Sequence, residues 1–131
     1  MTGPQYSLLV VDDNEMNRDL LTRRLECQGC QVTVAVDGLQ ALDLLDQADF
    51  DLVLLDIMLP VMNGYQVLEH LMADQSLSQV PVIIATSLDE ADGKARCLAL
   101  GAEDYLTKPF NPVVLKSRIS DCLARHQLPR P

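Results

Sequence analysis

The chain has 131 residues, a formal net charge of −9, and 48% apolar residues. This length suits one compact domain with a buried core, and the apolar content argues against disorder. The acidic charge disfavours direct binding to nucleic acid, because phosphates repel it. No apolar run approaches the roughly 18 residues that a membrane helix needs, and residues 1–5 lack the basic and apolar regions of a signal peptide. We therefore expect a cytoplasmic domain that binds neither nucleic acid nor membranes.

Short apolar runs alternate along the chain with segments of helical periodicity. The predicted elements are a strand at 7–11, a helix at 14–28, a strand at 31–36, a helix at 39–47, a strand at 51–56, a helix from 63–64 to about 74, a strand at 81–85, a helix at 89–100, a strand at 104–107 and a last helix from 111–112. Three of the strands are almost wholly apolar, which is typical of a parallel sheet covered on both faces. The pattern predicts an α/β fold and one domain over residues 1–131, with a core of about 7–125 and a short tail at 126–131.

The chain contains four cysteines: Cys27, Cys30, Cys97 and Cys122. Cys27 and Cys30 have the C-x-x-C spacing of zinc sites and redox motifs. A zinc site would need a second pair of ligands, and the other two cysteines stand alone. A redox motif usually opens a helix, whereas this one lies where a helix ends at Gly29. We therefore expect reduced cysteines that serve ordinary packing.

Polar residues stand at the carboxyl ends of four predicted strands. Asp12 and Asp13 follow the first strand, Asp56 ends the third, Thr86 follows the fourth and Lys108 follows the fifth. Each of them alone has an ordinary interpretation as a helix cap or a loop residue. Ligands of open parallel sheets bind at the carboxyl ends of the strands, so these side chains are predicted to converge on one edge.

Such a group of residues suits phosphoryl chemistry. Each pair of carboxylates about 4 Å apart costs about 4 kcal/mol at an effective dielectric constant near 20, so three of them need a counter-charge. Mg²⁺, which prefers carboxylate oxygens and waters, can supply it together with Lys108. A carboxylate held beside a metal ion, a lysine and a hydroxyl can attack phosphorus and form an acyl phosphate.

Four segments together resemble one family, the response-regulator receiver domain of two-component signalling systems. They are VVDDNEMNRDLL, DLVLLDIMLPVMNGYQVL, PVIIATS and GAEDYLTKPF, and the resemblance runs from about residue 8 to 123. It implies a flavodoxin-like, doubly wound sheet of five parallel strands in the order 2-1-3-4-5, with helices on both faces. It also implies a signalling switch that assists its own phosphorylation and dephosphorylation but is not an enzyme.

The resemblance assigns the phosphoacceptor and the metal ligands. Asp56 would take a phosphoryl group from the phosphohistidine of a histidine kinase or a histidine phosphotransfer protein, as one step of a phosphorelay. Asp13 and Asp56 would bind Mg²⁺ (or Mn²⁺) directly, together with the backbone carbonyl of Met58. Asp12 would act mainly through a metal-bound water.

The resemblance also assigns the residues of the switch. Thr86 would hydrogen-bond to the phosphoryl group and Lys108 would pair with it, while Tyr105 would be the rotating aromatic ring. The surface that changes would be the fourth helix, fifth strand and fifth helix, which would control a partner or output domain and could carry a homodimer contact.

The Lys108–Pro109 bond is expected to be cis by the same resemblance. Met58 and Leu88 would flank the hydrolytic water, and their apolar side chains predict slow loss of phosphate.

Three other interpretations compete with this one. A phosphatase of the haloacid type needs a second Asp two residues after its nucleophile, where this chain has Met58. A flavin or nucleotide binder would place a Gly-rich or Ser/Thr-rich loop after the first strand, where this chain has Asp12 and Asp13. A degenerate receiver would act as a phosphorylation-independent interaction module, and such modules typically lack the acidic pair, the acceptor Asp or the Lys.

Overall fold

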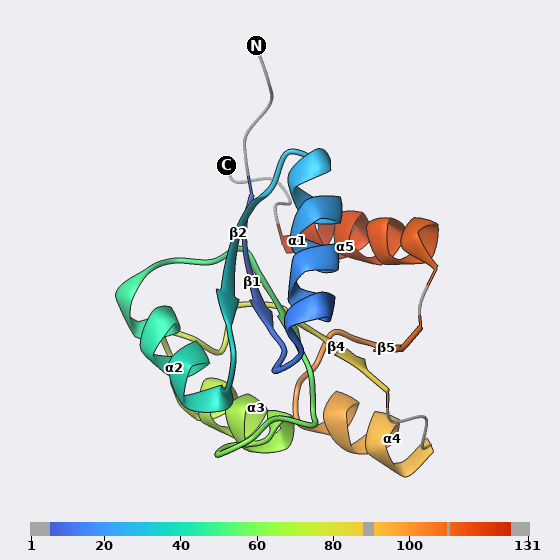
Figure 1. Ribbon diagram of the computed structural model, residues 1–131. Coiled ribbons are helices and arrows are strands. Elements are labelled where there is room, and N and C mark those ends of the chain that lie inside the picture. Colours follow the sequence, from blue (N-terminus) through green and yellow to red (C-terminus); the bar gives the residue numbers. More distant parts are fainter. Residues whose placement is uncertain (1–5, 88–90, 110, 127–131) are drawn as a thin grey trace.

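The computed structural model describes residues 6–87, 91–109 and 111–126. Within them, strands and helices alternate along the whole chain (Figure 1). They are β1 Ser7–Val11, α1 Glu15–Cys27, β2 Gln31–Ala35, α2 Gly38–Gln47, β3 Leu52–Leu55, α3 Gly64–Ala73, β4 Val82–Thr86, α4 Ala91–Ala99, β5 Asp104–Thr107 and α5 Pro112–His126. The strands form one sheet in the order β2-β1-β3-β4-β5, and every neighbouring pair is parallel. The predicted fold and strand order are confirmed.

The sheet separates two apolar layers, because alternate residues of a strand point to opposite faces. Leu8 and Val10 of β1 pack with α1 and α5, whereas Leu9 and Val11 pack with α2, α3 and α4. Figure 1 shows the same division, with α1 and α5 on one side of the sheet and the other helices on the opposite side.

No helix among the described residues combines the length and the apolar character that a membrane crossing requires.

Several predicted bounds differ from the observed ones by one or two residues. Asn14 precedes α1 as its N-cap, and its side chain accepts the N–H of Asn17. Asp56 lies just after β3, although its N–H still donates to the carbonyl of Val11 at 3.0 Å. Thr86 is the last residue of β4 and does not follow it. The predicted start of the fourth helix falls at residue 89, and residues 88–90 lie outside the described part of the chain.

The loop between β3 and α3 is tightly folded against the sheet. Gly64 opens α3 and donates its N–H to the carbonyl of Ile57 at 2.8 Å. A Cβ at Gly64 would lie 2.4 Å from the carbonyl oxygen of Asp56, so only glycine fits there. Val61 has a φ of 69°, which is unfavourable for a β-branched residue and costs about 1–3 kcal/mol.

The Lys108–Pro109 bond, which follows β5, is cis, as predicted.

Candidate functional site

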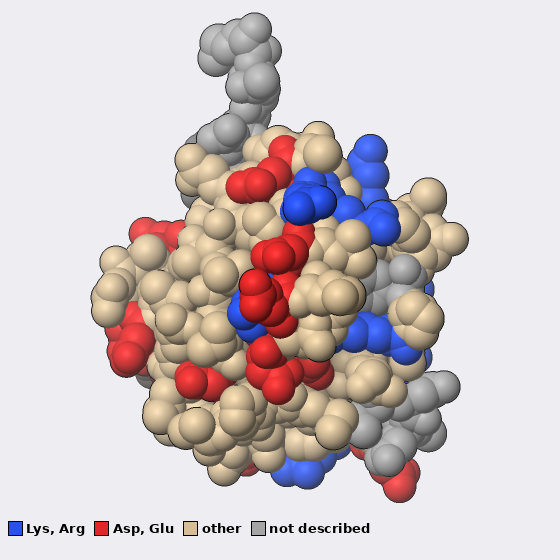
Figure 2. Space-filling model, viewed as in Figure 1, with Lys and Arg blue, Asp and Glu red and all other residues tan. Residues whose placement is uncertain are grey.

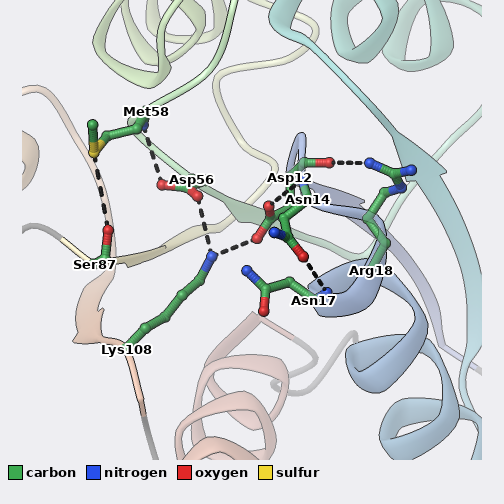
Figure 3. Close-up of polar contacts among 8 residues, drawn as sticks. All are labelled: Asp12, Asn14, Asn17, Arg18, Asp56, Met58, Ser87 and Lys108. Carbon is green, nitrogen blue, oxygen red and sulfur yellow. Dashed lines mark hydrogen bonds and ion pairs between the residues drawn. The ribbon is translucent and has the colours of Figure 1, made fainter.

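The ammonium group of Lys108 lies between two carboxylates at the carboxyl end of the sheet (Figure 3). Its Nζ contacts Oδ2 of Asp12 and lies 3.1 Å from Oδ2 of Asp56. Asp12 follows β1, Asp56 follows β3 and Lys108 follows β5, so one cation joins the ends of three strands. The structure thus brings together three of the residues that the sequence predicted to converge.

Asp12 is held in place by its immediate neighbours. Its side chain is almost fully buried, and its Oδ1 accepts the N–H of Asn14 at 2.9 Å. Its own N–H donates to the carbonyl of Ala35 at 3.1 Å, and its carbonyl accepts from Nη1 of Arg18 at 2.9 Å. These bonds leave Oδ2 directed at Lys108.

Asp56 is only 7% exposed, and both of its carboxylate oxygens have partners. Oδ1 accepts the N–H of Met58 at 3.1 Å and Oδ2 faces Lys108. Met58 itself is 56% exposed, and its sulfur accepts a weak hydrogen bond from the hydroxyl of Ser87 at 3.9 Å. Asp56 is therefore fixed at the base of the site, and Met58 and Ser87 form part of its rim. Leu88, the other predicted flanking residue, lies outside the described residues.

Asp13 completes a cluster of three carboxylates. One oxygen from each of Asp12, Asp13 and Asp56 lies within 4.8 Å of the others. Asp13 is exposed, whereas the other two are buried. Three carboxylates and one ammonium leave two negative charges uncompensated. The donor atoms are all hard oxygens, which is the set that suits Mg²⁺. The residues present therefore fit a divalent cation.

Further acidic side chains lie on α1, the helix that begins just after Asp13. Glu15 and Asp19 are exposed on α1, one turn apart. Figure 2 shows acidic side chains gathered down the middle of the face that carries α1. The negative field of this face attracts cations to the site.

Lys108 is charged in spite of its burial. Burial favours the neutral amine, but the hydrogen bond to Asp12 and the charges of Asp56 and Asp12 outweigh it, so the pKa of Lys108 lies above its ordinary value. The ammonium is therefore a permanent positive charge at neutral pH. An ammonium held next to a carboxylate can also contact an anionic group transferred to that carboxylate.

Thr86 and Tyr105 lie on neighbouring strands beside the site. Thr86 is fully buried at the end of β4, and its carbonyl accepts the N–H of Lys108 at 2.7 Å. Tyr105 is 8% exposed in β5, where it is in register with Ile84, two residues before Thr86. Because residues two apart on a strand share a face, Thr86 and Tyr105 belong to the sheet face covered by α2, α3 and α4.

Two residues of the site were not assigned from the sequence. Asn14 binds Asp12 through a local i to i+2 contact, and the Asp-x-Asn spacing is a signal that could have indicated it. Arg18 reaches back from α1 to the carbonyl of Asp12. No local pattern marks that contact, because it depends on where α1 packs.

The four cysteines form no disulfide bond. Cys30, Cys97 and Cys122 are buried and Cys27 is exposed, and all four are free. The packing role predicted for them is thus wrong for Cys27. Burial raises the pKa of Cys97 and of Cys122 to about 11, so both thiols are protonated at neutral pH.

Comparisons with known proteins agree with this geometry. Residues 8–120 match the family model described as the response regulator receiver domain. The transcriptional regulatory protein CpxR of Escherichia coli (strain K12) is 45% identical over 118 residues, which are 90% of this chain and 49% of CpxR. The chain spans about half the length of the curated relatives it matches.

Solved structures of similar domains cover nearly the whole chain. The receiver domain of a signal transduction histidine kinase from Syntrophus aciditrophicus is 30% identical with a TM-score of 0.88, covering 95% of each chain. The receiver domain of the sensor histidine kinase PA1611 from Pseudomonas aeruginosa PAO1 is 30% identical with a TM-score of 0.85, covering 92% of this chain and 99% of that one. That structure has a magnesium ion coordinated in its active site cleft.

Uncompensated charge in the cluster predicts a stabilising effect of Asp13→Asn. In metal-free buffer with a chelator, the variant should unfold at a melting temperature about 3 °C higher than wild type, because one of three repelling carboxylates is removed. Thermal unfolding followed by circular dichroism measures it. Asp43→Asn, at an exposed acidic residue on α2, is the matched control. An equal rise in both variants would mean that the cluster itself is not repulsive.

Proposed function

Because this chain belongs to the response regulator receiver domain family, we propose that it is a signalling switch phosphorylated on Asp56. The observation that carries this proposal is the position of the Lys108 ammonium, which lies between Asp12 and Asp56 with Asp13 alongside. Four of the residues predicted for phosphoryl transfer, Asp12, Asp13, Asp56 and Lys108, therefore meet at one edge of the sheet, which supports the proposal. We further propose that residues 7–125 form one receiver domain, and that it acts in the cytoplasm.

In the proposed reaction, a carboxylate oxygen of Asp56 attacks the phosphorus of a phosphohistidine. The new O–P bond forms as the P–N bond breaks, and the electron pair of the broken bond stays on the imidazole. The Lys108 ammonium contacts the transferred group, and the Thr86 hydroxyl donates a hydrogen bond to it. A Mg²⁺ or Mn²⁺ ion held directly by Asp13, Asp56 and the Met58 carbonyl, and by Asp12 through a water, would supply further positive charge at the phosphoryl oxygens.

The domain should therefore accept phosphate from a small-molecule donor. With acetyl phosphate and Mg²⁺, intact-protein mass spectrometry should find one phosphoryl adduct, and the adduct should disappear in Asp56→Asn. Asp43→Asn, an exposed acid on α2, is the control and should be labelled like wild type. An adduct that persists in Asp56→Asn would refute the acceptor, and a wild-type chain without an adduct would favour the phosphorylation-independent module.

We propose that the phosphodonor, a histidine kinase or histidine phosphotransfer protein, docks on α1 next to the site. Met16 is 78% exposed and Leu20 is 49% exposed on this helix. Leu20, with Arg24, lines a groove that continues to Lys108 and Pro109. A protein seated on this groove would bring its phosphohistidine to Asp56. A few side chains at the centre of such a contact give most of the binding energy, and Leu20 and Arg24 are the candidates here.

This docking site predicts a selective defect in Leu20→Asp. Transfer from a phosphohistidine protein should slow about tenfold or more, because a charge replaces an apolar contact, while labelling by acetyl phosphate should be unchanged. Phosphotransfer time courses with both donors measure the difference. Leu39→Asp on α2 is a matched control, since Leu39 is also 49% exposed. A variant that slows both donors equally would place Leu20 in the chemistry or the folding and not in docking.

We propose that phosphorylation changes the surface formed by α4, β5 and α5. The phosphoryl group would draw the Thr86 hydroxyl inward, and the Tyr105 ring would move into the space that it leaves. Two contacts can carry the change outward. Lys108 follows β5 directly, and the Arg118–Asp104 ion pair (2.8 Å) joins α5 to β5. A phosphate shifts such an equilibrium only by its differential contacts, and Thr86 and Lys108 provide them.

This same surface carries the proposed contact with a partner, an output domain or a second copy of the chain. Leu98 is 42% exposed on α4, and Val113 and Val114 are 74% and 40% exposed on α5. These apolar side chains would be covered in a homodimer or by an output domain. The role is that of a signalling domain: the phosphoryl group stays on the protein until water removes it, with the site assisting both steps.

Hydrogen–deuterium exchange tests the switch. Beryllium fluoride with Mg²⁺, a mimic of the aspartyl phosphate, should change amide exchange in peptides from α4, β5 and α5. Peptides from α2 should be unaffected, because no proposed contact reaches that helix. Asp56→Asn under the same conditions is the control and should show no change. Changes confined to α2 would refute the proposed surface.

A further inference from the structure

A second cluster of metal-binding side chains lies at the other end of β5. Glu103 directly precedes this strand, whereas Lys108 follows it, so the cluster is remote from Asp56. Cys122 and His126 lie on α5, and one ligand atom from each of the three residues lies within 4.8 Å of the others. The Nε2 atom of His126 is 2.8 Å from Oε1 of Glu103. Nothing in the proposed phosphoryl chemistry uses these side chains.

The backbone holds the three residues in this arrangement. Cys122 and His126 are four positions apart, so their side chains share one face of α5. The N–H of Glu103 donates to the carbonyl of Val82 at 2.8 Å, which fixes Glu103 beside β4. Helix α5 therefore presents two of the ligands, and the segment before β5 presents the third. Cys122 is fully buried and forms the floor, while the side chains of Glu103 and His126 are 31% and 35% exposed at the rim.

We propose that Glu103, Cys122 and His126 bind a Zn²⁺ ion through one oxygen, one sulfur and one nitrogen, with water as the fourth ligand. Thiolate and imidazole favour zinc over Mg²⁺, and three protein ligands with one open position are an established zinc arrangement. Bonds of about 2.0–2.3 Å place tetrahedral ligands roughly 3.5 Å apart. The three ligand atoms lie within 4.8 Å of one another, and His126 and Glu103 would exchange their hydrogen bond for bonds to the ion.

The Arg125 guanidinium lies beside both Glu103 and Cys122, so it would turn away from the thiol when zinc binds. Nη2 of Arg125 lies 3.6 Å from Oε2 of Glu103, whereas His126 faces Oε1. Arg125 can therefore keep its contact with one carboxylate oxygen while the other binds zinc, as outer partners of metal ligands do. The Cys122 proton would leave on binding, so thiolate and carboxylate together balance the ionic charge. The bound ion would tie the last turn of α5 to the segment before β5.

Cobalt spectroscopy of the full chain tests this site directly. Co²⁺ replaces Zn²⁺ in such sites, and its bond to a thiolate gives a charge-transfer band in the near ultraviolet. The titration is done with saturating Mg²⁺, which occupies the carboxylate cluster of Asp12, Asp13 and Asp56. That cluster cannot give this band, because it offers only oxygen ligands. Wild type should show the band, and Zn²⁺ should abolish it by competition. Absence of the band would overturn the proposal whether or not Asp56 is phosphorylated.

Variants of the rim identify the ligands without disturbing the core. His126→Gln and Glu103→Gln should each weaken Zn²⁺ binding at least about tenfold, measured by calorimetry, since even outer-shell changes have effects of that size. His70→Gln, at an exposed histidine on α3, and Cys27→Ser, at the exposed cysteine, are matched controls and should bind like wild type. Equal affinity in His126→Gln and wild type, or loss of the cobalt band in Cys27→Ser, would refute the assignment. Cys122→Ser should also lose the band, and circular dichroism establishes whether this variant is folded. If it is unfolded, the results for His126→Gln and Glu103→Gln test the proposal instead.

Discussion

The site depends on the ion pairs that the Lys108 ammonium forms with Asp12 and Asp56. Without it, the buried carboxylates of Asp12 and Asp56 would face each other in a region of low dielectric, where like charges repel strongly. With it, β1, β3 and β5 end at a common point. The backbone N–H of Lys108 also bonds to the carbonyl of Thr86, which adds β4 to the same junction. Lys108 therefore connects the carboxyl ends of four of the five strands.

The sequence predicted the fold well because its physical signals are strong. Near-continuous apolar strands such as Leu52–Leu55 indicate a sheet covered on both faces, and parallel order brings the strand ends to one edge. Asp12, Asp56 and Lys108 were predicted from this rule and meet there. The predicted ends of strands were less accurate. Asp56 lies after β3 and Thr86 within β4, since the ends depend on how neighbouring strands pair.

Other features of the site could not be predicted because they depend on packing between elements. Arg18 contacts the carbonyl of Asp12 only because α1 lies against β1. The sequence interpretation of the cysteines looked for a second cysteine pair and found none. Cys122 instead meets Glu103 and His126, and Glu103 is nineteen positions earlier in the chain, so no short motif joins them. Only the fold of β5 against α5 brings these residues together.

The close approach of Gly64 to the backbone of Asp56 has a consequence for how a signal can leave the site. The first turn of α3 lies directly on the carbonyl of Asp56, and no atom can be added between them. Asp56 also bonds to β1 through its N–H. The main chain of Asp56 is therefore held on two sides, by α3 and by β1. A phosphoryl group added there, as proposed, would act through Thr86 at the end of β4 and Lys108 after β5, and not through a shift of α3. The structural response would thereby be directed toward one half of the molecule.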